Sequence, residues 1–408
     1  MNKKKIINDP LYGFITLHSE LIFDILSHPH FQRLRHIKQL GLTDYVYPGA
    51  LHTRFQHALG AMHLMGKALD MLRFKGIEVN GDEYEASLIA ILLHDIGHGP
   101  FSHALEDALI PGIKHESLSY LFMDKMNKHF NGALDLTLRI FRNSYARKFF
   151  HQLVSSQLDI DRLDYLNRDS FFTGVHEGTI GVERIISMLS VNQGNLVVEQ
   201  KGIYSIENFL NARRLMYWQV YLHKTTVSTE RLLVNLIRRA QALVRAGETL
   251  LASEALLVFL QKEQTYNDFK ENEEVLNLFG QLDDNDIWGA VKFWKNHDDP
   301  ILSLLATMMI ERKLFKVKLS ADPIKKVQLE NIRDAVIKHY QVRSAEAPYL
   351  FSHGTVSNEA YAEGKEINIL MQSGEVLDIA QASDLPNIKA ISKIVKKNYL
   401  CWPKNVSL

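Results

Sequence analysis

Residues 88–107 read LIAILLHDIGHGPFSHALED, and this stretch places polar side chains at the end of an apolar helix. Residues 88–93 are apolar on nearly every side, which is typical of a helix enclosed by a protein core. His94 and Asp95 follow directly, and the glycines after them with Pro100 end the helix. A buried carboxylate is costly unless it pairs with a cation or a metal. Because the neighbours of Asp95 are imidazoles, the stretch favours a metal.

Two further segments supply matching ligands from other predicted helices. His57 stands in RFQHALG, near the start of a helix expected over residues 53–75, and Asp161 stands in LDIDRLDYLNRD on a later helix. With His94 and Asp95 they form a set of two nitrogens and two oxygens on three helices. Such a set suits a divalent ion such as Mn, Fe, Zn, Ni, Co or Mg. The alternative is that His57 and Asp161 are surface residues and that the other two only cap a helix.

The composition excludes several classes of protein. Lysine plus arginine and aspartate plus glutamate both number 47 in 408 residues, so no overall field recruits nucleic acid or an anionic membrane. The one cysteine, Cys401, rules out a disulfide framework and suits a reducing compartment. No apolar run approaches the roughly 20 residues of a membrane span, and we expect a cytoplasmic protein. Fifteen of the eighteen histidines lie at or before His223, which places the chemistry in the first half.

The periodicity along the chain predicts mainly helices. A hairpin is expected over residues 3–17 and a strand pair around Gly194 and Gly202, and the tail from about residue 349 alternates as antiparallel strands do. Helical spacing covers residues 21–26, 31–40, 53–75, 88–95, 115–126, 134–141, 148–173, 206–222, 226–246 and 253–340. The expected organisation is a mainly α protein with a catalytic core at 1–250, a helical extension at 251–345 and a small β-containing region at 346–408.

Four motifs carry a resemblance to a known family. They are FQRLRHIKQLG at residues 31–41, RFQHALG at 54–60, LLHDIGHGPFSH at 92–103 and LDIDRLDYLNRD at 158–169. Together they resemble the HD-domain phosphohydrolases, in particular the deoxynucleoside triphosphate (dNTP) triphosphohydrolase branch with the bacterial dGTPases and the SAM-and-HD-domain proteins. The resemblance implies an HD-domain helical bundle and a homo-oligomer. It also implies that the ligands of a divalent metal are His57, His94, Asp95 and Asp161.

The resemblance also implies catalytic roles beside the metal. Hydrolysis at the α-phosphorus needs an activated water and a proton donor for the leaving 5′-oxygen. Family members place histidines at the positions of His98, His103 and His115 around the α-phosphate. They have an aspartate close to the position of Glu106, which keeps the charge here and adds a methylene. The alternative for each histidine is a hydrogen-bonded imidazole in the core.

Substrate contacts follow from the same resemblance. Independently of the resemblance, the spacing alone places Arg54 one helical turn from His57. The implied triphosphate-binding residues are Arg54, Arg162 (commonly lysine in the family), Arg213 and Lys224. The implied sugar-binding residues are Gln39, Leu40, Tyr165 or Tyr221, and Asp169. A tyrosine ring can exclude a 2′-hydroxyl, while polar groups bond the 3′-hydroxyl. The alternatives are solvated side chains for the basic residues and ordinary packing for the tyrosines.

Three functions follow as hypotheses. The first is a dNTP triphosphohydrolase, the second is an HD phosphohydrolase of another nucleotide (a monophosphatase or phosphodiesterase), and the third is a catalytically idle module that binds a nucleotide. Intact ligands argue against the third, because buried charges are costly to keep without a use. The resemblance adds a regulatory nucleotide at a subunit interface. Arg238 and Arg239 are candidates to bind it, although a solvated helix face explains them equally well.

Overall fold

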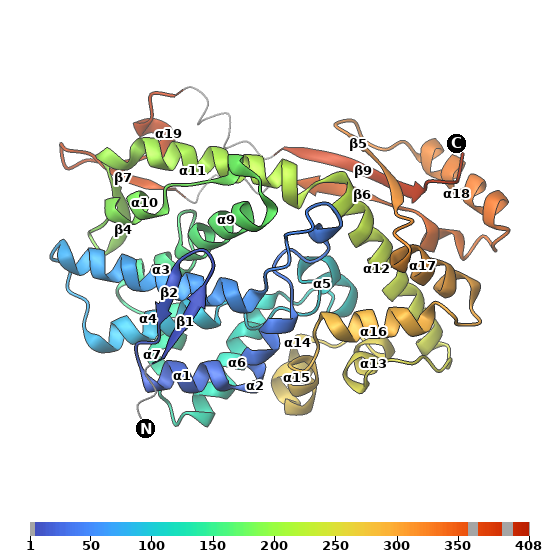
Figure 1. Ribbon diagram of the computed structural model, residues 1–408, viewed down its shortest axis with the longest axis horizontal. Coiled ribbons are helices and arrows are strands. Elements are labelled where there is room, and N and C mark those ends of the chain that lie inside the picture. Colours follow the sequence, from blue (N-terminus) through green and yellow to red (C-terminus); the bar gives the residue numbers. More distant parts are fainter. Residues whose placement is uncertain (1–4, 358–365, 386–394, 408) are drawn as a thin grey trace.

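The protein is mainly helical, as the sequence predicts, and its described residues form three small sheets (Figure 1). The computed structural model describes residues 5–357, 366–385 and 395–407. Parts of the hairpin expected over residues 3–17 and of the β-containing region expected at 346–408 therefore lie outside the described residues. Within the described part of the chain, no helix combines the length and apolar character that a membrane crossing requires.

Three helices form the centre of the N-terminal half: α3 (Arg54–Phe74), α4 (Gly81–Leu93) and α9 (Ile160–Thr173). Helix α3 packs against both α4 and α9. Residues 88–93 of α4 are fully enclosed, with no side chain more than 1% exposed. The prediction of a buried helix ahead of His94 is confirmed. Helix α9 begins where the Asp159 side chain accepts a hydrogen bond from the backbone of Arg162 at 2.8 Å.

Short helices and turns surround this centre. They are α1 (Glu20–Ser27), α2 (Pro29–Gln32), η1 (Arg33–His36), η2 (Thr43–Tyr45), α5 (His103–Leu109), α6 (His115–His129), α7 (Asp135–Phe141), α8 (Lys148–Val154), η3 (His176–Gly178) and α10 (Val182–Met188). The helical spacing over residues 148–173 belongs to two helices, because residues 155–159 separate α8 from α9.

Two hairpins flank the helices. Strands β1 (Ile6–Asp9) and β2 (Gly13–Thr16) pair antiparallel, and β2 packs on α3. Strands β3 (Leu189–Asn192) and β4 (Asn195–Glu199) form the second hairpin, with its turn at Gly194. The expectation of a strand around Gly202 is wrong. There η4 (Gln200–Gly202) leads into α11 (Ile203–Met216), because Ile206, Phe209 and Leu210 follow helical spacing and are buried.

After α11 the chain makes a π-helical turn, η5 (Tyr217–Tyr221), and then enters α12 (Lys224–Arg245). The helices of the C-terminal half are α13 (Glu254–Gln261), α14 (Tyr266–Glu271), α15 (Glu273–Phe279), α16 (Asp284–Trp294), α17 (Pro300–Ile310), α18 (Lys326–Tyr340), η6 (Ala347–Leu350) and α19 (Ile379–Ala382). Helix α12 packs against α5 of the N-terminal half and against α13 and α17 of the C-terminal half. It therefore joins the two halves.

The all-helical expectation for residues 253–340 is wrong at β5 (Phe315–Ser320). Its sequence FKVKLS alternates apolar and polar residues, as a half-buried strand does, but its partner lies about 80 residues later. The other tail strands are β6 (Ser352–Ser357), β7 (Asn368–Leu370), β8 (Val376–Asp378) and β9 (Lys396–Pro403). Strand β9 pairs with β5 and β6, whereas β7 pairs in parallel with β4. The tail therefore returns to the N-terminal half.

Candidate metal centre and active site

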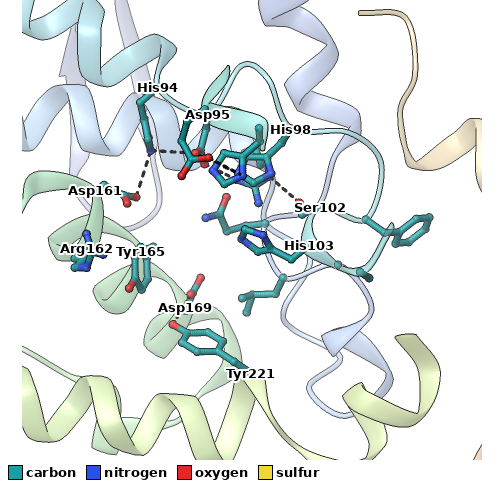
Figure 2. Close-up of a pocket in the computed structure, with 18 of the residues that line it drawn as sticks. His94, Asp95, His98, Ser102, His103, Asp161, Arg162, Tyr165, Asp169 and Tyr221 are labelled. Carbon is teal, nitrogen blue, oxygen red and sulfur yellow. Dashed lines mark hydrogen bonds and ion pairs between the residues drawn. The ribbon is translucent and has the colours of Figure 1, made fainter. Parts of the chain in front are cut away.

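Three helices supply the four predicted ligands, and Figure 2 shows His94, Asp95 and Asp161 close together at one side of the pocket. His57 lies in the first turn of α3, His94 and Asp95 follow the last turn of α4, and Asp161 lies in the first turn of α9. Nε2 of His57 is 3.4 Å from Nε2 of His94 and 3.1 Å from Oδ1 of Asp161. Nε2 of His94 is 3.2 Å from Oδ1 of Asp95 and 3.3 Å from Oδ1 of Asp161. The ligand atoms of His57, His94 and Asp161 therefore lie within 4.8 Å of one another, and Asp95 adjoins this group through its contact with His94.

This arrangement fits a divalent metal ion. Metal bonds of about 2.1 Å to histidine nitrogen and carboxylate oxygen place neighbouring ligand atoms roughly 3.0 to 3.4 Å apart. The distances between the ligand atoms above fall in this range. Two nitrogens with two carboxylates suit Mn, Fe, Zn, Ni, Co or Mg and leave positions for water and substrate. The protein therefore has a binding site for a divalent metal ion.

Both histidine ligands are oriented through their second ring nitrogen. Nδ1 of His57 lies 2.8 Å from Oδ2 of Asp164, and Nδ1 of His94 lies 2.6 Å from the carbonyl oxygen of Ile91. A proton held on Nδ1 leaves the lone pair of Nε2 free for a metal. These two contacts turn both Nε2 atoms toward Asp161.

Opposite charges stabilise the ionised carboxylates of the centre. Burial alone would lower the pKa of His57, but the carboxylates of Asp161 and Asp164 raise it to about 10. Burial would raise the pKa of Asp161, but His94 and His57 lower it. Asp95 also accepts a hydrogen bond from Nη1 of Arg54. A metal that binds here must therefore displace protons from the imidazoles.

The metal ligands open onto a pocket of about 610 Å³. The predicted site residues that line it are Gln39, Leu40, Arg54, His94, Asp95, His98, His103, His115, Asp161, Arg162, Tyr165, Asp169 and Tyr221. The predicted residues absent from its lining are His57, Glu106, Arg213 and Lys224. The structure therefore brings together most of the residues nominated from the sequence.

The three remaining predicted histidines form a cluster beside the metal ligands. The rings of His98 and His115 are stacked with centroids 3.7 Å apart, and His103 lies edge-on to both. Glu106 places one oxygen 3.3 Å from Nδ1 of His103 and the other 3.4 Å from Nδ1 of His115. Nε2 of His98 lies 3.4 Å from Oδ1 of Asp95. His103 is not a core imidazole, because its side chain is 72% exposed.

The cluster combines a neutral imidazole with an ionised carboxylate. Burial lowers the pKa of His98 well below its usual 6.5, and the charges of Arg54 and His115 act in the same direction. Burial would raise the pKa of Glu106, but hydrogen bonds with His103 and His115 lower it below its ordinary value. His98 is therefore uncharged at neutral pH, whereas Glu106 carries a negative charge.

Hydrogen bonds from both halves of the chain hold the loop between α4 and α5. Arg33 donates to the carbonyl oxygens of His98 at 2.9 Å and Ile96 at 2.7 Å. Asp284 at the start of α16 accepts the backbone N–H of Phe101 at 2.8 Å. Phe101 and Ser102 adopt φ angles of 52° and 49°, which residues other than glycine rarely do. Such strain persists only where the surroundings fix it, as these contacts do.

Asp169 anchors the end of the pocket away from the metal ligands (Figure 2). Its two carboxylate oxygens lie 2.7 Å from Nε2 of His52 and 2.7 Å from the hydroxyl of Tyr221, which donates. The rings of Tyr165 and Tyr221 are 6.4 Å apart and steeply inclined. The π-helical turn η5 presents both Tyr217 and Tyr221 to the pocket, and such turns are frequent at functional sites.

Three side-chain polar atoms of pocket residues have no partner among the described residues: Oε1 of Gln39, Nε of Arg162 and Oγ1 of Thr226. Oε1 of Gln39 is buried and accepts no hydrogen bond, and Nε of Arg162 is buried and donates none. Nη1 of Arg162 donates to Asp159. An unmet acceptor and an unmet donor are costly unless a ligand or water completes them.

Two basic residues nominated by resemblance lie outside the pocket lining. Arg213 is buried and donates to Gln157 at 2.9 Å, so the alternative of a solvated surface arginine is wrong for this residue. Lys224 is exposed and lines a separate hollow with Lys316 and Lys318.

The arginines considered for a regulatory nucleotide differ from each other. Arg238 is exposed, whereas Arg239 forms a two-pronged ion pair with Asp299 of the C-terminal half. This ion pair accounts for the position of Arg239 without a bound nucleotide.

Several site residues were not anticipated from the sequence. Asp164 follows Asp161 by three residues in the same motif, and that spacing places both on one face of a helix. His52 lies in an irregular loop and Asp284 lies 183 residues from Phe101, so no periodic pattern points to either. Ser102 accepts a hydrogen bond from Nε of Arg54 at 2.8 Å and lines the pocket.

Comparisons with known proteins place this chain among HD-domain proteins. The family model for the HD domain matches residues 54–168, and that for the HD associated region matches residues 180–257. A crystal structure of a phosphohydrolase from Bacteroides thetaiotaomicron has a TM-score of 0.95 and 51% identity, covering 98% of this chain and 100% of that one. An uncharacterized protein of Mycoplasma pneumoniae is 32% identical over 80% of this chain and 83% of its own length.

A more distant relative has a named activity. Deoxynucleoside triphosphate triphosphohydrolase SAMHD1 of Homo sapiens is 29% identical over 54% of this chain, which spans 42% of that protein. The matched HD region runs from Arg54 to Arg168 and so contains all four predicted metal ligands. The chain therefore belongs to the HD-domain family of metal-dependent phosphohydrolases.

Proposed function

We propose that this protein is a dNTP triphosphohydrolase, which converts a dNTP and water to a deoxynucleoside and inorganic triphosphate. The observation that carries the proposal is the unmet acceptor of Gln39 in the same pocket as the metal ligands and Asp169. A hydroxyl group satisfies such an acceptor, and the 3′-hydroxyl of a sugar is the hydroxyl that a nucleotide offers at a fixed distance from its phosphates. The similarity to SAMHD1 supports the same substrate class.

The reaction requires that water attack the α-phosphorus while the bond from phosphorus to the 5′-oxygen breaks. A divalent ion in the centre supplies Lewis-acid chemistry, because it lowers the pKa of water and offsets phosphate charge. The 5′-oxygen leaves with a proton taken from a general acid. We assign this role to His103, because it is exposed to the pocket and Glu106 lies 3.3 Å from its Nδ1. Its Nε2 is then the atom that donates.

The neutral imidazole of His98 suits a different role. Because its pKa is lowered by burial, it is a hydrogen-bonding group beside the α-phosphate and not a proton donor at neutral pH. His115 stacks on His98 and forms a hydrogen bond with Glu106. We therefore propose that His115 holds His98 and Glu106 in place.

Arginines next to the metal ligands meet the charge of the triphosphate in this proposal. Arg54 is held by Asp95 and Ser102, which fixes its guanidinium at the pocket wall. The unmet Nε of Arg162 offers a donor on the opposite helix. Planar guanidinium groups suit phosphate oxygens better than a point charge does.

The sugar is selected by Asp169 and the tyrosines in this proposal. His52 and Tyr221 fix the Asp169 carboxylate, and the second lone pairs of its oxygens can accept a sugar hydroxyl together with Gln39. Leu40 and Tyr165 line the same region and restrict space for a 2′-hydroxyl. A rigid polar pocket of this kind discriminates more strongly than an apolar one.

Product analysis tests the proposal. The protein is incubated with Mn(II) and separately with each dNTP, each ribonucleotide triphosphate and a generic phosphodiester, and the products are resolved by anion-exchange chromatography. We expect intact triphosphate and deoxynucleoside from dNTPs alone. Orthophosphate or diester cleavage would support an HD phosphohydrolase of another nucleotide instead. Nucleotide binding without any product would support the idle module.

Other expectations stay predictions. These are the division of the chain near residues 250 and 345, a homo-oligomer, a regulatory nucleotide, the use of Arg213 and Lys224 toward the triphosphate, and a cytoplasmic location.

A further inference from the structure

We propose that Asp9 of the N-terminal hairpin and Arg168 of α9 are positioning residues for the metal ligand His57. They act through Asp164, in the order Asp9, Arg168, Asp164, His57. The inference rests on the metal centre and not on the substrate proposed above. It assigns the β1–β2 hairpin a role in holding the metal.

The four side chains form an unbroken series of polar contacts. Nη1 of Arg168 donates to Oδ2 of Asp9 at 2.8 Å, and its Nε and Nη2 donate to the two oxygens of Asp164 at 2.9 and 3.0 Å. Oδ2 of Asp164 lies 2.8 Å from Nδ1 of His57. The side chains of all but Asp9 are fully buried, and that of Asp9 is 3% exposed. No solvent competes for these contacts.

Asp9 is fixed by the hairpin itself. Its other oxygen, Oδ1, accepts the backbone N–H groups of Leu11 and Tyr12, each at 3.0 Å, and so closes the turn between β1 and β2. The ring of Tyr12 lies 5.5 Å from the Arg168 guanidinium. Asp9 therefore uses one oxygen for the turn and the other for Arg168.

Helix α3 leaves room for this series at Gly60. A Cβ atom there would lie 2.1 Å from both Nη2 of Arg168 and Oδ1 of Asp164. Any side chain at this position would displace the ion pair that orients His57, which lies one helical turn earlier. Gly60, the last residue of the RFQHALG motif, therefore leaves the space that is needed by the ion pair orienting the metal ligand His57.

The charges explain why Asp9 matters to a metal that it does not touch. Two carboxylates and one guanidinium leave one net negative charge beside Nδ1 of His57, which holds the proton on Nδ1 and makes Nε2 a stronger ligand. Without the charge of Asp9, Arg168 and Asp164 would neutralise each other. Asp164 would then attract the Nδ1 proton less strongly, and Nε2 would bind a cation less tightly.

The test uses the substitution Asp9→Asn in the full chain. The amide keeps an oxygen for the backbone of Leu11 and Tyr12 and loses the charge that faces Arg168. Affinity for Co(II) and Mn(II) is measured by competition with a chelator. We expect Kd to rise by about fivefold or more, below the 10- to 100-fold typical of a side chain bonded directly to a ligand. Asp9→Glu, which keeps the charge, should recover part of the loss.

The matched control is Asp299→Asn. Asp299 also forms a two-pronged, largely buried arginine pair and accepts a backbone N–H, but it is the N-cap residue of α17 and touches no metal ligand. Its substitution should lower stability and leave Kd within about twofold of the original, because its partner is outside the metal centre.

A second measurement covers the case in which Asp9→Asn folds poorly. In the Zn(II)-loaded original protein and in Asp9→Ser, which keeps a hydroxyl oxygen for the turn and removes the charge, the proton NMR signal of His57 Nδ1–H reports the hydrogen bond to Asp164. We expect a downfield signal that shifts between the two proteins. Unchanged Kd in Asp9→Asn, or an unshifted signal where that variant does not fold, would make Asp9 a structural residue only. Neither readout depends on hydrolysis of a dNTP, so failure of the proposed function leaves this test intact.

Discussion

Nδ1 of His57 lies 2.8 Å from a carboxylate oxygen of Asp164, and both side chains are fully buried. Asp164 follows the metal ligand Asp161 by three residues on α9, whereas His57 stands on α3. One turn of a single helix therefore supplies one ligand and orients another. This relationship makes the metal centre depend on the packing of α3 against α9.

The substitution Asp164→Asn should weaken metal binding by roughly 10- to 100-fold. The amide can donate a hydrogen to Nδ1 of His57, and the imidazole proton would then move to Nε2, the atom that faces the metal. Isothermal titration with Mn(II) measures the change. Asp107→Asn, at an exposed carboxylate on α5, serves as the control and should bind as the original does. Original affinity in Asp164→Asn would contradict the assigned orientation of His57.

The stability contributed by Glu106 should depend on pH. Hydrogen bonds with His103 and His115 lower the pKa of Glu106 in the folded protein below its ordinary value of 4.5. The folded state thus favours the ionised form, so the contribution is full above about pH 4.5 and is lost as the pH falls further. Urea unfolding of the original and Glu106→Gln from pH 3 to pH 7 should show a difference that narrows below about pH 4.5. A constant difference at every pH would contradict the pairing.

The substitution Tyr221→Phe should lower kcat/KM for dNTPs by about tenfold, the equivalent of one hydrogen bond. It removes the hydroxyl that holds Asp169 at 2.7 Å while keeping the ring. Discrimination against ribonucleotides should persist, because Leu40 and Tyr165, which we propose restrict space for the 2′-hydroxyl, are unchanged. Tyr204→Phe, at a tyrosine 72% exposed on α11, is the control. An equal kcat/KM for Tyr221→Phe and the original protein would contradict the proposed role of Asp169 in sugar binding.

Gly97→Ala should destabilise the fold by about 1 to 3 kcal/mol. A Cβ atom at Gly97 would lie 2.3 Å from the backbone oxygen of His115 and 2.3 Å from the backbone nitrogen of Ser119, so the loop must move away from α6. Gly81→Ala, at the open start of α4, adds the same methyl without a contact and should leave the free energy of unfolding nearly unchanged. Urea unfolding separates the two. Equal stability would show that the loop has space that the structure does not provide.

The sequence was sufficient to predict the centre of the fold because the relevant signals are local. The apolar run of residues 88–93 followed by His94 and Asp95 needs only one helix to be interpreted. His57 and Asp161 were predicted as ligands from the motifs that contain them. In the structure, Nε2 of His57 lies 3.1 Å from Oδ1 of Asp161. Arg54 was placed near His57 by one helical turn and pairs with Asp95 beside it.

Long-range contacts could not be predicted in the same way. Strand β5 is stabilised by β9, whose residues follow about 80 positions later, and Asp284 clamps Phe101 across 183 positions. Nothing in the local pattern around His52 indicates that its ring bonds Asp169. Such pairings depend on how separate elements pack, and hydrophobic periodicity carries no information about them.

Hydrolysis in ¹⁸O-labelled water tests the central claim most directly. The protein is given Mn(II) and dGTP, and the products are followed by ³¹P NMR. Attack of water on the α-phosphorus with loss of the 5′-oxygen predicts one ¹⁸O atom on a terminal phosphate of intact triphosphate and none on the deoxynucleoside. Label in orthophosphate or in the 5′-hydroxyl of the deoxynucleoside would contradict the account.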